Sequence, residues 1–176
     1  MVTVTRKLWL SVVFCLSAIP SLATPSACTL PQPVQAVLDD KWRGWRLLQL
    51  ADLRSDDQTL WREHPQNGKL CPGVNQGKFD GLHTGLVFTL VRNSEEQVVI
   101  VATPGGDSYT TTVLSKPVKV PYFSVVNVFP SGRYKDFYTG RATQIRADSA
   151  AVEAIEASVT LFYFEGGRWK SLLISD

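Results

Sequence analysis

Two apolar runs on either side of a short polar segment constrain the fold of this chain more than any other feature. Residues 86–92 (LVFTLVR) and 97–103 (QVVIVAT) are rich in β-branched residues, and residues 93–96 (NSEE) between them are polar. This pattern predicts a β-hairpin. The second run is almost continuously apolar, which is typical of a strand that is covered on both faces. We therefore expect this hairpin at the centre of the fold.

The segment before the hairpin is dense in turn-forming residues. Residues 66–85 contain the pairs Asn67-Gly68 and Pro72-Gly73, and glycine recurs at positions 77, 81 and 85. Such a density of turn signals argues against regular secondary structure. We expect an irregular loop here.

The first 23 residues have the pattern of a secretory signal peptide. Arg6 and Lys7 precede an apolar run over residues 8–19, and small residues lead to a cleavage site after Ala23. The run is shorter than the roughly 20 apolar residues that a membrane-spanning helix needs. We expect residues 1–23 to be removed, which leaves a periplasmic or secreted chain, residues 24–176, without a membrane span.

Removal of that segment changes both the charge and the cysteine count. The whole chain has a formal net charge of +2, and loss of Arg6 and Lys7 leaves 16 basic and 16 acidic residues. A neutral chain gives no support for nucleic-acid binding. Cys28 and Cys71 remain as an even pair in an oxidising compartment, and we predict a disulfide between them. A metal-binding or redox pair is the alternative, although the CxxC spacing of such sites is absent.

The remaining patterns predict the other elements of the fold. Helices are expected at residues 31–43 and 55–64, the second with a capping box formed by Ser55 and Gln58. Extended patterns follow, and residues 149–157 suit either a helix or a strand. The chain closes with two strands around Gly166-Gly167, a pair that favours a type I′ turn. These patterns predict a single α+β domain over residues 24–176, with a largely antiparallel sheet and two short N-terminal helices.

Groups suited to catalysis are scarce. The chain has two histidines, His64 and His83, and lacks GxSxG and phosphate-binding motifs. Asp80 and His83 lie three residues apart in the glycine-rich loop, so they could meet as the acid–base pair of a small extracytoplasmic hydrolase. A histidine that is only solvated is the alternative. We therefore assign no catalytic residue, cofactor or metal site, and keep Asp80 and His83 as an alternative site.

One segment has the composition of a binding surface. Residues 133–141 (RYKDFYTGR) interleave basic and aromatic side chains. In an extended segment, alternation would place rings on one face and charges on the other, and such a surface can bind sugars, peptides or anions. An ordinary half-buried strand is the alternative. The candidate binding residues are Arg133, Tyr134, Lys135, Phe137, Tyr138 and Arg141.

The glycine-rich loop also carries a resemblance. Its sequence VNQGKFDGLHTG resembles the GDFDGDG loop of FG-GAP (integrin-type) repeats, and segments such as WRLLQLADL and FYFEGGRWKSLLISD are similar to small secreted bacterial proteins related to that signature. The loops of such repeats bind calcium through alternating acidic residues. Only Asp80 matches that pattern here, so the resemblance implies a structural module with a vestigial calcium-type loop.

Together these features favour an exported, non-catalytic protein of the cell envelope or periplasm. Scarce catalytic groups, zero net charge and plentiful aromatic residues suit a protein that works by binding another protein, as inhibitor and immunity proteins do. The hydrolase and the structural module are the alternatives.

Overall fold

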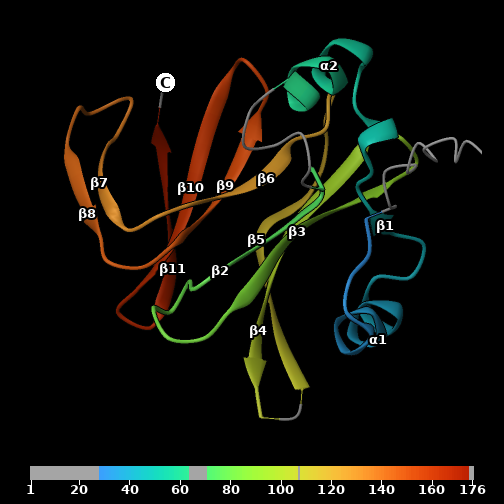
Figure 1. Ribbon diagram of the computed structural model, residues 1–176, viewed down its shortest axis with the longest axis horizontal. Coiled ribbons are helices and arrows are strands. Elements are labelled where there is room, and N and C mark those ends of the chain that lie inside the picture. Colours follow the sequence, from blue (N-terminus) through green and yellow to red (C-terminus); the bar gives the residue numbers. More distant parts are fainter. Residues whose placement is uncertain (1–27, 64–70, 107, 175–176) are drawn as a thin grey trace, which may run out of the picture.

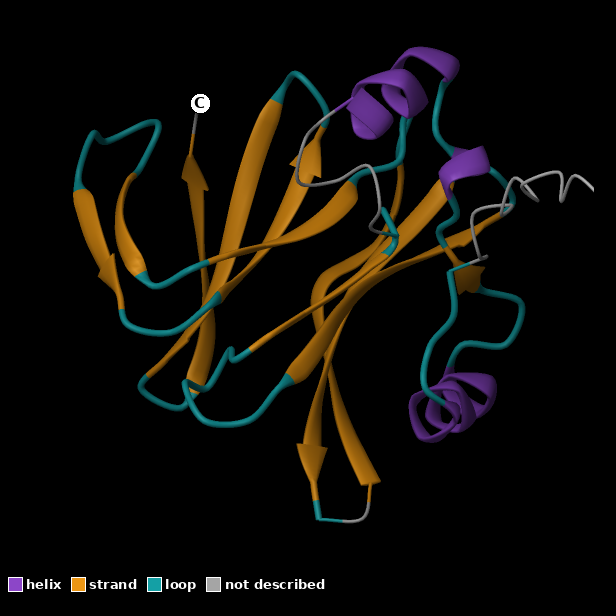
Figure 2. Cartoon of the chain, in the orientation of Figure 1, coloured by secondary structure: helices purple, strands orange, loops and turns teal. Residues whose placement is uncertain are grey.

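The computed structural model describes residues 28–63, 71–106 and 108–174. Within these residues, two α-helices accompany sheets that are built from antiparallel strands, in agreement with the expected α+β class; Figure 2 shows how far the strands outweigh the helices. In chain order the elements are α1 (Gln32–Lys41), β1 (Arg46–Leu47), a 3₁₀ turn (Leu50–Asp52), α2 (Ser55–Glu63), β2 (Val74–Gly77), β3 (Gly85–Arg92), β4 (Glu96–Gly105), β5 (Ser108–Lys119), β6 (Val125–Phe129), β7 (Gly132–Lys135), β8 (Ala142–Ile145), β9 (Ser149–Ala154), β10 (Ser158–Glu165) and β11 (Arg168–Ile174).

The β3–β4 hairpin is the centre of the first sheet, as the two apolar runs predicted. The strand order is β1-β3-β4-β5, and β2 also pairs with β3. Asn93 and Ser94 occupy the left-handed region at the turn, a conformation that asparagine tolerates better than most residues. The polar segment therefore forms the predicted connection.

Strand β4 is buried on both faces, which explains its continuous apolar run. Ile100 packs with Val34 and Leu38 of α1. Val101 points to the other face and packs with Val126 of the second sheet. The central strand thus lies between a helix and a sheet, because successive side chains of a strand point to opposite faces.

The second sheet has the strand order β11-β10-β9-β6. Gly166 and Gly167 both have positive φ at the β10–β11 turn, as the predicted type I′ turn requires. The ambiguous residues 149–157 form β9 and then a turn with Glu156 in the left-handed region. Pairing with β6 and β10 on its two sides makes β9 a strand despite its alanine content.

The β7–β8 hairpin covers the outer face of the second sheet. Ile145 of β8 is buried with Leu161 and Ile174, and Tyr134 of β7 packs against the same cluster. Figure 1 shows this hairpin on the side of the molecule opposite α1. The order of layers is therefore α1, first sheet, second sheet, β7–β8 hairpin.

Two local predictions were wrong. Part of the loop expected at residues 66–85 is strand β2, which pairs with β3, while residues 64–70, including His64, lie outside the described part of the chain. Gly77 suits that strand because an added Cβ would lie 2.9 Å from Val128 Cγ1. The capping box of α2 is absent: the Gln58 side chain donates to the carbonyl oxygen of Leu53, and the Ser55 hydroxyl donates to the neighbouring Asp56.

Cys28 and Cys71 form the predicted disulfide, with their Cα atoms 5.6 Å apart. The bond joins the residues before α1 to those before β2. Gln49 also holds the segment before α1, because its Oε1 accepts from the Cys28 N–H and its Nε2 donates to the Cys28 carbonyl. Among the described residues, no helix is long and apolar enough to cross a membrane.

Candidate functional site

The candidate binding residues gather on the β7–β8 hairpin. Arg133 and Lys135 point into solvent from β7, and Tyr134 between them is half-buried against Phe129, with the ring centroids 6.1 Å apart. The Tyr134 hydroxyl donates to the carbonyl oxygen of Pro130 over 2.6 Å. Tyr134 therefore anchors the hairpin to the fold and leaves its two basic neighbours outside.

Asp136 directly follows β7 and fixes the turn. Its carboxylate accepts from the Thr139 N–H at 2.7 Å, and its own N–H donates to the Arg141 carbonyl at 2.9 Å. The Thr139 hydrogen bonds lower the pKa of Asp136. Gly140 closes the turn in the left-handed region that glycine adopts readily. This acidic residue in the basic segment thus has a local structural role.

The turn presents two aromatic rings to solvent. Phe137 is 57% exposed and Tyr138 is 80% exposed, and the rings contact edge to face with their centroids 5.3 Å apart. The Phe137 N–H donates to the carbonyl oxygen of Leu173 in β11, which holds the turn against the second sheet. The rings are therefore exposed on a backbone that is fixed at several points.

A depression of about 390 Å³ lies beside these rings. Its walls come from β7, the turn and the end of β11 (Arg133, Tyr134, Lys135, Asp136, Phe137, Gly140 and Ile174). Arg141 is exposed at the far end of the same turn. The hairpin thus combines exposed rings, three cations and a shallow pocket.

The alternative pair also meets in the structure. His83 Nδ1 lies 2.8 Å from Asp80 Oδ2, and Asp80 Oδ1 accepts from the backbone N–H groups of Leu82 and His83. The His83 contact, followed by these backbone hydrogen bonds, lowers the pKa of Asp80 to about 2. Asp80 is therefore ionised at neutral pH, and the His83 ring is largely exposed beside it.

The contacts of this loop bear on both alternative functions. Among the described residues, Asp80 is the one whose side chain hydrogen-bonds to the His83 ring. Both Asp80 carboxylate oxygens already accept hydrogen bonds from the loop itself. Within the same part of the chain, no group of three His, Cys, Asp or Glu residues could hold a metal ion.

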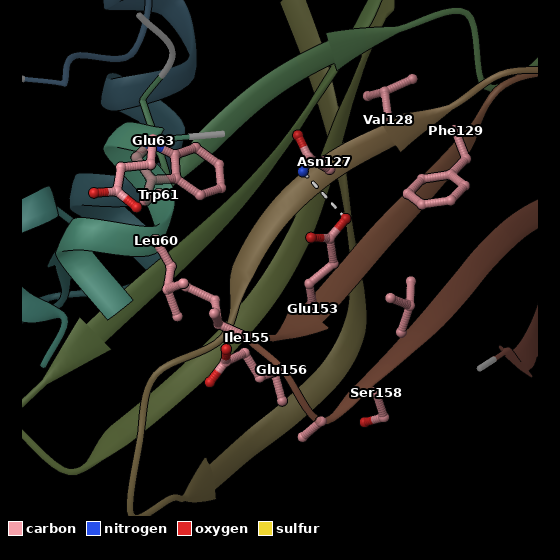
Figure 3. A pocket seen from close by; sticks show the side chains of 13 residues that line it. Leu60, Trp61, Glu63, Asn127, Val128, Phe129, Glu153, Ile155, Glu156 and Ser158 are labelled. Atoms are coloured by element: carbon pink, nitrogen blue, oxygen red, sulfur yellow. Dashed lines mark hydrogen bonds between the residues drawn. The ribbon is translucent and has the colours of Figure 1, made fainter. Parts of the chain in front are cut away.

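Another pocket lies between α2 and the second sheet (Figure 3). Its volume is about 530 Å³, and Glu63, Glu153 and Glu156 line it together with apolar residues. The amide of Asn127 donates to Glu153 Oε1 at 3.1 Å. Sequence reasoning missed this pocket because its walls come from three distant segments, none of which carries a motif.

The comparisons with known proteins identify no relative. No protein-family model, curated protein or solved structure matches this chain.

Proposed function

We propose that this chain is an exported, non-catalytic protein that binds another protein through the β7–β8 hairpin. The observation that carries the proposal is the exposed pair Phe137 and Tyr138, held on a fixed turn between basic residues. Burial of large aromatic side chains supplies much of the energy of protein interfaces, and tyrosine and arginine are enriched in their hot spots.

The rigidity of the turn supports this use. The hydrogen bond from the Thr139 N–H to the Asp136 carboxylate and that from the Phe137 N–H to the Leu173 carbonyl already fix the backbone that carries the rings. Little conformational entropy is then lost when a partner covers them, which favours affinity. A backbone fixed before binding is a common property of protein inhibitors.

The charges of the hairpin suggest the chemistry of the partner. Arg133, Lys135 and Arg141 are exposed, whereas the carboxylate of Asp136 is engaged in the turn. An acidic surface on the partner would complement them and speed association. The depression beside Phe137 is large enough to admit a side chain of the partner.

Export is the second part of the proposal, and the Cys28–Cys71 disulfide supports it because such bonds persist in oxidising compartments. Mass spectrometry of the protein from its own cells tests this directly. Loss of residues 1–23 and the absence of free thiols are the expected results. Two cysteines that react with an alkylating agent without prior reduction would contradict it.

Photo-cross-linking tests the binding surface. A photoreactive phenylalanine at Tyr138 should cross-link one envelope protein in stoichiometric amounts, while the same group at Tyr122, a control that is 56% exposed on another part of the fold, should not. Changing both Phe137 and Tyr138 to Ser should abolish co-purification of that protein. Equal cross-linking from both positions, or a complex that survives the double substitution, would contradict the proposal.

The 2.8 Å contact between Asp80 and His83 keeps a hydrolase as the second candidate. In that case Asp80 would orient the ring of His83, which would act as a general base. His83→Ala should then abolish turnover of an ester or peptide substrate without changing the melting temperature. A structural module with a vestigial calcium-type loop predicts instead that calcium raises the melting temperature and that chelation lowers it.

A further inference from the structure

The edges of the two large sheets differ in how they are protected. Unpaired N–H and C=O groups at a sheet edge pair with other chains unless something covers them. At β11 the Phe137 N–H occupies one such carbonyl, and β1 is only two residues long. Strand β6 lies beside the β2 segment, where the Val126 N–H donates to the Pro72 carbonyl over 2.9 Å. The β1 edge is therefore short, the β6 edge lies beside another segment, and one carbonyl of the β11 edge is occupied.

Strand β5 is the exception. It is twelve residues long, and among the described residues it pairs with β4 on one side and with no strand on the other. None of its side chains is fully buried, and Val113 and Val118 are exposed. A long edge without a strand partner, with exposed valines and with α1 nearby, is therefore left at the end of the first sheet.

The two halves of β5 differ in the features that hinder pairing with another strand. Residues 115–119 contain Lys116, Pro117 and Lys119, and the register with β4 shifts twice between Val113 and Val118. Lysine, proline and irregular register are common defences of an edge strand. Residues 108–113 (SYTTTV) have no charge and no proline, and they pair with β4 in unbroken register. Residues 108–113 therefore lack the features that would hinder pairing with another strand.

We propose that residues 109–113 of β5 pair antiparallel with the same residues of a second copy, with the two-fold axis at Thr111. A two-fold axis perpendicular to the sheet leaves the same face of both copies on the same side of the joined sheet. Directly opposite residues of the two strands point to the same face, so one residue must lie on the axis, opposite its own counterpart. The dimer would continue the first sheet across both molecules, with α1 of each copy on the same face.

The side chains select this register. With Thr111 on the axis, Tyr109 of one copy lies opposite Val113 of the other, and aromatic residues pair favourably with β-branched ones across strands. Both residues lie on the α1 face, where Tyr109 already packs against the core cluster and Val113 is 42% exposed. Thr110 then faces Thr112. Lys116 and Lys119 fall outside the paired stretch, so no like charges oppose one another.

A cysteine pair tests this arrangement. In Thr111→Cys protein that retains its Cys28–Cys71 disulfide, the two new thiols lie directly opposite, and mild oxidation should give a covalent dimer. Thr112→Cys is the matched control, because its thiols point to the other face and are offset along the strands. Equal cross-linking of the two variants, or cross-linking of Thr112→Cys alone, would overturn the proposal.

Sedimentation equilibrium supplies a second test that needs no cross-link. The unmodified protein should dimerise reversibly, and Thr111→Lys should raise the dimer dissociation constant at least tenfold because it places two ammonium groups face to face. Its melting temperature, measured where the protein is monomeric, reports whether it folds. A protein that stays monomeric at every concentration, or a dimer of unchanged affinity in folded Thr111→Lys, would show that a second copy does not occupy this edge.

Discussion

The β3–β4 and β7–β8 hairpins are both pairs of antiparallel strands, yet the fold uses them in opposite ways. In β4 every side chain from Gln97 to Ala102 is buried, whereas Ile145 is the one fully buried residue in β7 and β8. The first hairpin therefore holds the layers together. The second covers one sheet with a few residues and presents the others to solvent. Residues that the fold does not need are the ones that remain available to a partner.

Truncation of a large side chain should lower the free energy of unfolding much more in the β3–β4 hairpin than in the β7–β8 hairpin, and Phe88 should show the largest effect. Phe88 in β3 is completely buried and packs in the cluster that includes α1. Phe88→Ala should lower the free energy of unfolding by about 3–5 kcal/mol, since it removes apolar contacts and leaves a cavity. Urea unfolding monitored by tryptophan fluorescence measures this change. Tyr138→Ala is the matched control, and an equal loss in both variants would remove the distinction drawn between the hairpins.

Removal of the Tyr134 hydroxyl, which anchors the β7–β8 hairpin, should have an intermediate effect on the free energy of unfolding. Tyr134→Phe removes the hydroxyl that donates to the Pro130 carbonyl and keeps the ring that packs on Phe129. We expect a loss of about 1 kcal/mol in the free energy of unfolding, the usual contribution of one hydrogen bond. Hydrogen exchange of the Asp136 and Phe137 amides should accelerate as well. Unchanged exchange at these amides would mean that Tyr134 does not hold the turn.

The sequence predicted those parts of the fold whose signals are local. The Gly166-Gly167 turn and the polar segment at residues 93–96 are set by the backbone preferences of a few neighbouring residues. Strand β2 could not be predicted in this way, because Val74–Gly77 becomes a strand only through pairing with β3. The same holds for β9, whose alanines would suit a helix if β6 and β10 did not flank it.

The candidate site was predictable in composition and less so in shape. Alternation along residues 133–135 indicated outward cations and an inward ring, because that part of the segment is extended. The exposure of Phe137 and Tyr138 depends on the turn that Asp136 makes, which breaks the alternation. The pocket beside α2 gave no signal at all, since Glu63 and Glu153 come to line one pocket only after the chain has folded.

Protonation of Asp80 should have a smaller effect on the free energy of unfolding, and this effect is confined to acid pH. Because the folded pKa of about 2 lies below the ordinary value of 3.8, ionised Asp80 favours the folded state above that ordinary value. Its contribution is lost as the pH falls from about 4 towards 2, and it is modest because the pair is exposed to solvent. A carboxyl NMR titration should place the Asp80 pKa near 2 in the unmodified protein and closer to 3.8 in His83→Ala. An unchanged value in the variant would show that His83 does not stabilise the carboxylate.

The exposed rings should have the smallest effect on stability and the clearest effect on binding. Changing Phe137 and Tyr138 to Ser removes side chains that lie mostly in solvent, so the free energy of unfolding should change by no more than about 0.5 kcal/mol. The hydrogen bonds that fix the turn use the Asp136 carboxylate and backbone groups, and both substitutions leave these in place. Loss of the partner in this variant, with an unchanged urea midpoint, would therefore follow from the missing rings and not from a disturbed hairpin. A stability loss as large as that of Phe88→Ala would instead make Phe137 and Tyr138 part of the core, and the hairpin would no longer be a surface free to bind.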